Sequence, residues 1–153
     1  MTQVQAIPQG YHSLTPYMTI RNCAEAIEFY KKAFGAVQTV RIDGEDNKVM
    51  HAELKIGDSI LMMTDENIKM DHKGPELLKG TPVSVLLYVE NVDDVFNRAV
   101  KAGATVVSKV EDQFFGDRMG TLKDPYGHIW SISTHIEDVS PDEMEKRMKK
   151  MKH

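Results

Sequence analysis

His51 and Glu53 form the pair in this sequence that is best suited to chemistry. They stand two residues apart in "KVMHAELKI", where polar and apolar residues alternate as in a β-strand. Side chains two apart on a strand lie on one face, which would place an imidazole beside a carboxylate. Such a pair can act as base and orienter in proton transfer, or bind a metal. We take Glu53 and His51 as candidate catalytic residues; the alternative is a solvated polar pair.

The same alternation predicts which side of this strand faces the core. Met50, Ala52 and Leu54 form the more apolar set, and we expect them to be buried together. His51 and Glu53 would then lie on the opposite side.

A second group of candidates lies in "DQFFGDRMG". Phe114 and Phe115 could form aromatic walls, and the guanidinium of Arg118 could hold an anionic or planar ligand beside them. An equally good interpretation is a hairpin with a surface ion pair between Asp117 and Arg118, which would contribute little to stability.

Other reactive patterns are scarce. The sequence has no phosphate-binding glycine loop, no Gly-x-Ser-x-Gly and no His-Glu-x-x-His. Its single cysteine, Cys23, excludes an internal disulfide, and we interpret it as buried and structural. In "DPYGHIWSIS" we interpret His128 as a turn residue and Trp130 as part of the core.

These residues would be positioned by two halves with the same order of elements. The pattern of "MTIRNCAEAIEFYKKAFGA" matches that of "LYVENVDDVFNRAVKAGA", and each half reads as strand, helix and three strands. We expect helices capped by Asn22 and Asn91 and ended by Gly35 and Gly103. The predicted strands cover residues 11–20, 37–42, 48–56, 60–65, 83–91, 105–114, a short stretch within 115–127, and 128–135.

The repeat also sets the expected domain organisation. Module one covers about residues 11–65, a linker about 66–81 and module two about 82–136, followed by a helix at about 140–151. One helix can cover only one face of a sheet, so each module needs a second module against its other face. That second module would come from the same chain or from a partner chain.

Composition limits the function classes. The 153 residues carry a net charge of −4, which does not favour binding to a phosphate backbone, so we expect no nucleic-acid partner. The apolar runs are too short to span a bilayer, and the N-terminal stretch lacks the features of a signal peptide. We expect a cytoplasmic protein without a membrane partner.

At the level of the whole repeat, the sequence resembles the vicinal-oxygen-chelate superfamily. This superfamily includes glyoxalase I, bleomycin-resistance proteins and extradiol dioxygenases. The resemblance is carried by the segments "AIEFYKKAFGA", "HAELKIGDSILMMTDE" and "GDRMGTLKDPYGHIWSISTH". The PhnB-like branch is the most similar. The resemblance implies one α+β domain over residues 1–153, with paired βαβββ modules whose mixed sheets curl round a shared cavity. It also implies a homodimer.

The resemblance further implies four strand positions that carry metal ligands in metal-dependent members. Flanking patterns place these positions at Thr15, Glu53, Ser84 and Ser131. Hydroxyl groups are poor ligands for zinc or nickel, so we expect no metal and no other cofactor. The alternative is a displaced divalent-metal site that joins His51 and Glu53 to His12 or His135.

Three functions remain as hypotheses. The first is a small-molecule-binding protein similar to bleomycin-resistance proteins. The second is a lyase or isomerase acting on a small carbonyl compound, with Glu53 and His51 in proton transfer, and the third is a structural module with a silent pocket. The expected ligand-binding residues are Thr15, Tyr17, Ser84, Phe114, Phe115, Arg118 and Ser131.

Overall fold

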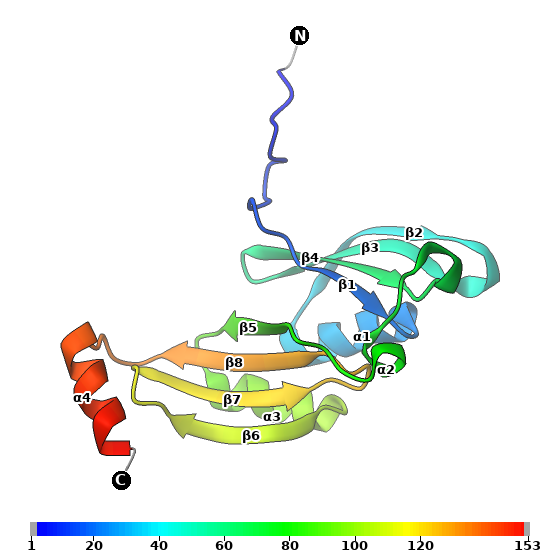
Figure 1. Ribbon diagram of the computed structural model, residues 1–153. Helices are drawn as coiled ribbons and strands as arrows, with labels where there is room; N and C mark the ends of the chain where they lie inside the picture. The colour runs from blue at the N-terminus through cyan, green and yellow to red at the C-terminus, as the bar shows by residue number, and fades with distance from the viewer. Residues whose placement is uncertain (1–2, 152–153) are drawn as a thin grey trace. The chain divides into compact units, whose positions relative to one another are not determined.

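The computed structural model describes residues 3–151, which divide into two compact units. The first unit comprises the chain up to Thr81 together with Pro125–Gly127, and the second comprises Pro82–Asp124 and the chain from His128 onward. Each unit contains one four-stranded mixed sheet (Figure 1). Within residues 3–151, no helix is both long and apolar enough to cross a bilayer.

The first unit is built from one strand, one helix and three further strands. They are β1 (Tyr17–Ile20), α1 (Cys23–Phe34), β2 (Val37–Asp43), β3 (Val49–Ile56) and β4 (Ser59–Asp65). The strands lie in the order β1-β4-β3-β2, with β1 parallel to β4 and the other neighbours antiparallel. A short helical turn, η1 (Glu45–Asn47), joins β2 to β3.

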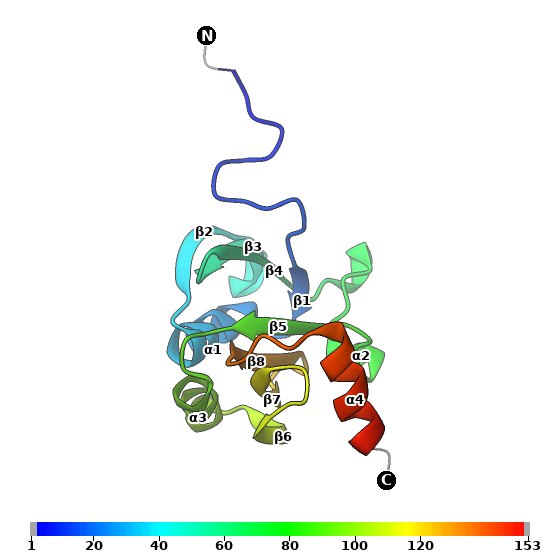
Figure 2. The same cartoon turned by 90° about the vertical axis from the view of Figure 1, so that its left-hand side faces the viewer.

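The second unit repeats this plan. Its elements are β5 (Ser84–Tyr88), α3 (Val92–Ala102), β6 (Thr105–Asp112), β7 (Asp117–Lys123) and β8 (Ile129–His135), in the sheet order β5-β8-β7-β6. Helix α3 contacts β6, β7 and β8 and covers one face of this sheet (Figure 2). The predicted α+β class with a repeated βαβββ order is therefore confirmed.

Short helices occupy the segments outside the two repeats. The expected linker contains η2 (Ile68–Met70) and α2 (Pro75–Leu78), and α4 (Pro141–Met151) follows the last strand. The Ser140 hydroxyl accepts a hydrogen bond from the Glu143 N–H, as an N-cap residue does.

The first strand is shorter than its sequence pattern suggested. We predicted a strand over residues 11–20, but regular pairing begins only at Tyr17. Pro16 lacks the N–H that pairing with a neighbouring strand requires, which limits the strand at this end. Residues 3–16 form an irregular segment that leads into β1.

The core of the first unit lies between α1 and one face of its sheet. The buried residues of α1 recur every three or four positions, which gives an apolar stripe typical of an amphipathic helix. Ile20, Leu54 and Met63 are fully or almost fully buried on the sheet. Cys23 is also completely buried, and burial raises the pKa of its thiol to about 12. The predicted structural role of Cys23 fits this position.

The start of α1 differs from the prediction. Asn22 has a left-handed backbone (φ 58°), and its side chain makes no capping hydrogen bond, so the predicted Asn22 cap is wrong. Asp65, at the end of β4, replaces it: Oδ1 accepts the Cys23 N–H at 3.0 Å, and Oδ2 accepts the Val49 N–H at 2.7 Å. By contrast, Asn91 caps α3 as predicted, because its Oδ1 accepts the Asp94 N–H at 3.1 Å.

The face pattern of β3 also changes at its beginning. Val49 is 1% exposed and Met50 is 59% exposed, so the expectation that Met50 belongs to the core is wrong. The pairing of β2 with β3 shifts register between Ile42 and Asp43, and a bulge of this kind reverses the faces of the residues beyond it. From His51 onward the predicted alternation holds, with Ala52 and Leu54 buried.

Replacing Asp65 with Ala should destabilise the first unit by about 1–3 kcal/mol, because two backbone N–H groups lose their acceptor. Urea denaturation followed by circular dichroism measures this loss. Asp58→Ala, which removes an exposed turn carboxylate, is the matched control and should change stability much less. Equal effects of the two substitutions would contradict the capping role of Asp65.

Candidate functional site

The face of the first sheet opposite α1 holds the candidate catalytic pair. Tyr17, Met62 and Glu53 are direct neighbours across β1, β4 and β3, so their side chains share this face. His51 lies two residues before Glu53 on β3 and points the same way. We call this surface the open face of the first unit. The sequence-based prediction that His51 and Glu53 share a face therefore agrees with the structure.

Glu53 is a buried carboxylate with a donor at each oxygen. It is only 7% exposed. The Tyr11 hydroxyl donates to Oε1, and His51 Nε2 lies 2.7 Å from Oε2. Since Nε2 must carry a proton to bond a carboxylate, Nδ1 is the acceptor in the neutral ring. The Tyr17 hydroxyl lies 3.3 Å from Nδ1 and extends the chain of contacts to an exposed side chain.

These contacts decide the charge of Glu53. Burial by itself would raise the pKa of this carboxyl group, but the hydrogen bonds from Tyr11 and His51 outweigh it, and the net pKa is lowered. The Tyr11 hydroxyl has a raised pKa because it donates to this carboxylate. Glu53 is therefore an anion with a low affinity for protons. It is better suited to orient His51 than to act as the base itself.

A pocket of about 400 Å³ opens beside Glu53. Its apolar lining comes from Ala6, Ile7, Pro8 and Met62. Its polar lining comes from Tyr11, His12, Ser13, Thr15 and Glu53. Most of these residues belong to the irregular N-terminal segment, where the loose alternation of residues 11–20 predicted a strand. Of these residues, we predicted from the sequence that Thr15 binds ligand and Glu53 is catalytic, and we named His12 for a displaced metal site. Tyr11 was not predicted.

The remaining expected ligand-binding residues lie in the second unit. Ser84 is exposed at the start of β5, and the Ser131 hydroxyl pairs with that of Thr121 at 3.2 Å. Phe114 and Phe115 meet edge to face at the turn between β6 and β7, with ring centroids 5.3 Å apart. Arg147 of α4 donates to the carbonyl oxygen of Phe114 at 3.2 Å and so fixes this turn to the C-terminal helix.

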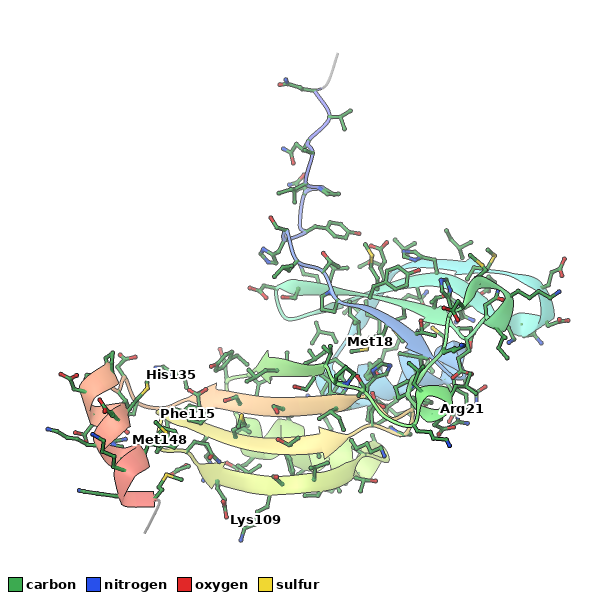
Figure 3. The ribbon with its side chains drawn as sticks, in the orientation of Figure 1. Met18, Arg21, Lys109, Phe115, His135 and Met148 are labelled. Carbon is green, nitrogen blue, oxygen red and sulfur yellow. The ribbon has the colours of Figure 1, made fainter. Side chains whose placement is uncertain are left out.

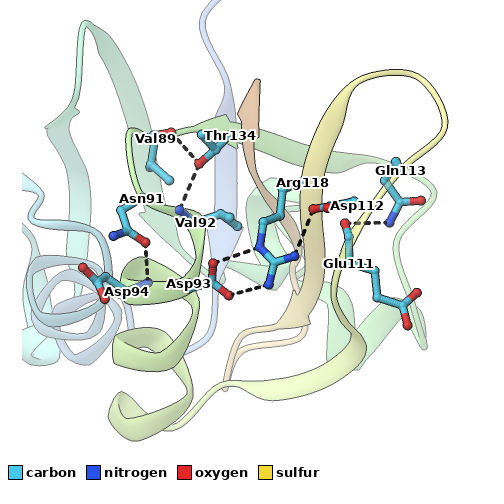
Figure 4. A network of polar contacts seen from close by, with 10 residues as sticks. All are labelled: Val89, Asn91, Val92, Asp93, Asp94, Glu111, Asp112, Gln113, Arg118 and Thr134. Atoms are coloured by element: carbon cyan, nitrogen blue, oxygen red, sulfur yellow. Dashed lines mark hydrogen bonds and ion pairs between the residues drawn. The ribbon is translucent and has the colours of Figure 1, made fainter. Parts of the chain in front are cut away.

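Arg118 is already engaged by carboxylates (Figure 4). Its Nε and Nη2 bind both oxygens of Asp93 at 2.9 and 3.0 Å, and its Nη1 binds Asp112 at 2.9 Å. These bonds tie β7 to the first turn of α3 and to the end of β6, and they raise the pKa of the guanidinium. The geometry favours ion pairing of this arginine over capture of an anion, with Asp93 and Asp112 as partners in place of the expected Asp117.

The four family ligand positions do not fit a zinc or nickel ion. Thr15, Ser84 and Ser131 offer only neutral hydroxyls, and Glu53 is the one strong ligand among them. Strand pairing also shows that Glu53 and Ser131 occupy different places in the repeat. Ser131 pairs with Leu86 of β5 as Met62 pairs with Tyr17 of β1, so Met62 is its counterpart. The sequence pattern placed this position on β3 instead of β4, because the two adjacent strands have the same alternating pattern.

The alternative of a displaced metal site needs a third ligand beside His51 and Glu53. His12 lines the pocket with Glu53, whereas His135 lies in the second unit. Among residues 3–151, His, Cys, Asp and Glu side chains nowhere gather in groups of three or more that could hold a metal ion.

A second buried carboxylate, Asp117, lies in the second unit. We did not predict from the sequence that it would be buried. It is 3% exposed and accepts hydrogen bonds from Tyr88 at 2.7 Å, Ser133 at 3.1 Å and His135 at 2.8 Å. The expected surface pair of Asp117 with Arg118 is wrong, because consecutive strand residues point to opposite faces. The two-residue spacing of Ser133 and His135 on one strand was the sequence signal that could have indicated a polar cluster here.

His135 joins Asp117 to the segment before α4. Its Nδ1 faces Asp117, and its Nε2 lies 2.7 Å from Asp138. Figure 3 shows His135 where β8 ends and the chain turns towards α4. Both contacts need a protonated nitrogen. The hydrogen bonds to Asp138 and Asp117 therefore raise the pKa of this imidazole above 6.5, its ordinary value.

The stability of the second unit should therefore depend on pH through His135. A raised folded-state pKa gives a contribution that is fully present below pH 6.5 and is lost as pH rises through the folded value. Melting temperatures measured across this range should fall more steeply for the wild type than for His135→Gln. His72→Gln is the matched control and should keep the wild-type slope. An unchanged slope in His135→Gln would contradict the contribution.

Comparison with known proteins agrees with this architecture. The family model for the glyoxalase/bleomycin resistance protein/dioxygenase superfamily matches residues 12–132. An uncharacterized protein of Mycobacterium bovis is 42% identical over 139 residues, which cover 89% of this chain and 91% of that protein.

Solved structures show the same fold at lower identity. TioX from Micromonospora sp. ML1 superposes with a TM-score of 0.64 at 23% identity, covering 82% of this chain and 99% of TioX. A PhnB protein from Bacillus cereus gives a TM-score of 0.63 at 19% identity, covering 80% and 99%. The chain belongs to the glyoxalase/bleomycin resistance protein/dioxygenase superfamily.

Proposed function

We propose that this chain is a small-molecule-binding protein of the superfamily, with its ligand in the pocket beside Glu53. The observation that carries the proposal is a pocket of about 400 Å³ with a buried carboxylate in its wall. Small-molecule sites are commonly about 300–1,000 Å³, mostly apolar, with a few fixed polar groups. The pocket has this size, and its lining joins four apolar residues to five polar ones.

The pocket is also organised before a ligand arrives. Tyr11 and His51 hold the two oxygens of Glu53, so this carboxylate need not find its orientation when a ligand binds. Tyr11 contributes both to this anchoring and to the lining. A fixed polar group costs less side-chain entropy on binding than a mobile one.

We propose that no divalent metal or other cofactor takes part. The reason is the chemistry of the donors, since three of the four family positions carry hydroxyls that bind zinc or nickel weakly. The site then relies on shape and hydrogen bonding alone.

A homodimer in the cytoplasm remains our proposal for the assembly and location. Leu86 and Tyr88, on the face of the second sheet opposite α3, are 46% and 59% exposed. Apolar side chains on a sheet face without a helix support an association in which that face is covered.

Binding should depend on Glu53. Compounds found by a thermal-shift screen of the wild type should bind Glu53→Gln about tenfold more weakly or worse, because a hydrogen bond to a charged group contributes about 1.5–3 kcal/mol. Glu28→Gln, which changes an exposed glutamate of α1, is the matched control and should retain binding. Compounds that shift all three proteins equally would contradict this site.

A lyase or isomerase that acts on a small carbonyl compound is the second candidate. The 2.7 Å contact between His51 and Glu53 favours it, because Glu53 can orient the ring and stabilise the imidazolium that forms. His51 Nδ1 would take the proton next to the carbonyl once the Tyr17 hydroxyl moves aside.

Substitution of His51 distinguishes the two candidate functions. For an enzyme, His51→Gln should lower kcat by roughly 100-fold or more on any substrate found, with little change in KM. A binding protein shows no turnover in either form. Unchanged turnover in His51→Gln would exclude His51 as the base.

A further inference from the structure

We infer that the ligand of the Glu53 pocket carries a protonated amine, an inference that rests on the proposed function. It depends on one juxtaposition: a buried carboxylate forms part of a small pocket whose lining contains no lysine or arginine. His12 is the one basic side chain in that lining, and a ligand ammonium would supply a permanent positive charge, which an imidazole is not.

Neither group bonded to Glu53 carries a permanent positive charge. Tyr11 donates through a neutral hydroxyl. His51 donates through Nε2, while its Nδ1 lies within reach of the Tyr17 hydroxyl. The two donors therefore stabilise the anion by hydrogen bonding, and neither of them is a lysine or an arginine.

The lysine nearest along the strand does not fill this role. Lys55 lies two residues after Glu53 on β3, but its side chain is exposed and does not line the pocket. The lowered pKa of Glu53 arises from Tyr11 and His51. A buried carboxylate without a permanently charged partner is costly, and a cation that enters the pocket recovers part of that cost.

Glu53 can still accept a hydrogen bond from a ligand. Each carboxylate oxygen has two acceptor positions, and each is used once, by Tyr11 or by His51. The ring of Tyr11 can attract a cation through its π face, and Met62 and Ile7 can contact an apolar body. The pocket thus fits an ammonium group joined to a small apolar or aromatic portion.

The same charge should exclude a carboxylate ligand. A second anion in the pocket would be repelled by the Glu53 carboxylate. The structure therefore predicts a ranking by charge among ligands of one shape, with the cation first and the anion last.

Three probes with the same phenylethyl body test this ranking. Phenethylamine is cationic, 2-phenylethanol is neutral, and 3-phenylpropionate is anionic. Isothermal titration of the full-length wild type should show phenethylamine binding at least about tenfold tighter than 2-phenylethanol, in line with a charged hydrogen bond, and 3-phenylpropionate binding most weakly.

Three variants assign this preference to Glu53. In Glu53→Gln the preference for the amine should disappear, whereas Glu28→Gln should keep it. Tyr11→Phe guards against a folding defect in Glu53→Gln, because it leaves the carboxylate in place and removes one of its donors. Tyr11→Phe should bind phenethylamine at least as tightly, relative to 2-phenylethanol, as the wild type does.

Other outcomes would overturn the inference. They are equal binding of the three probes, tighter binding of 3-phenylpropionate, an amine preference that persists in Glu53→Gln, and no binding of phenethylamine to the wild type. If 2-phenylethanol binds as well as the amine and both are lost in Glu53→Gln, the pocket remains the ligand site and only the charge assignment fails. If screened compounds bind independently of Glu53, the proposed function fails as well.

Discussion

Each sheet in this protein has one helix, and that constraint shapes the rest of the structure. A helix with one apolar stripe can cover only one face of four strands, so α1 and α3 each leave an opposite face without a helix. These faces carry polar side chains such as Glu53 and Asp117 beside apolar ones such as Leu86. The candidate site and the second carboxylate cluster both lie there. The position of the helix on each sheet therefore determines which face can hold the polar side chains of a site.

The two units satisfy a buried carboxylate in related ways but with different consequences. Glu53 and Asp117 each accept a hydrogen bond from a tyrosine and one from a histidine. His135 also reaches a second carboxylate, Asp138, which makes it a clamp between strand and C-terminal segment. Glu53 instead borders a pocket. The Asp117 arrangement is suited to holding the chain in place, and the Glu53 arrangement is suited to binding a ligand.

The repeat has diverged at its helix starts as well. In the first unit the Asp65 carboxylate accepts the Cys23 N–H, and in the second the Thr134 hydroxyl accepts the Val92 N–H (Figure 4). Both acceptors sit on the last strand of their unit and hold the helix onto the sheet. Asp65 also binds the first N–H of β3, so it couples the helix start to the strand that carries His51 and Glu53. A structural carboxylate in the first unit therefore supports the candidate site indirectly.

The amino-acid sequence by itself determined the repeated order of elements, the α+β class and the common face of His51 and Glu53. These features follow from local periodicity, which needs only near neighbours along the chain. Met50 shows the limit of such periodicity, because it is the extra residue of a β3 bulge in the pairing with β2, which reversed its face. Tertiary structure alone decided the partners of the carboxylates. Tyr11 reaches Glu53 across 42 residues, and Tyr88 reaches Asp117 across 29. Contacts over such separations depend on which strands become neighbours, and no periodic pattern in one segment encodes that choice.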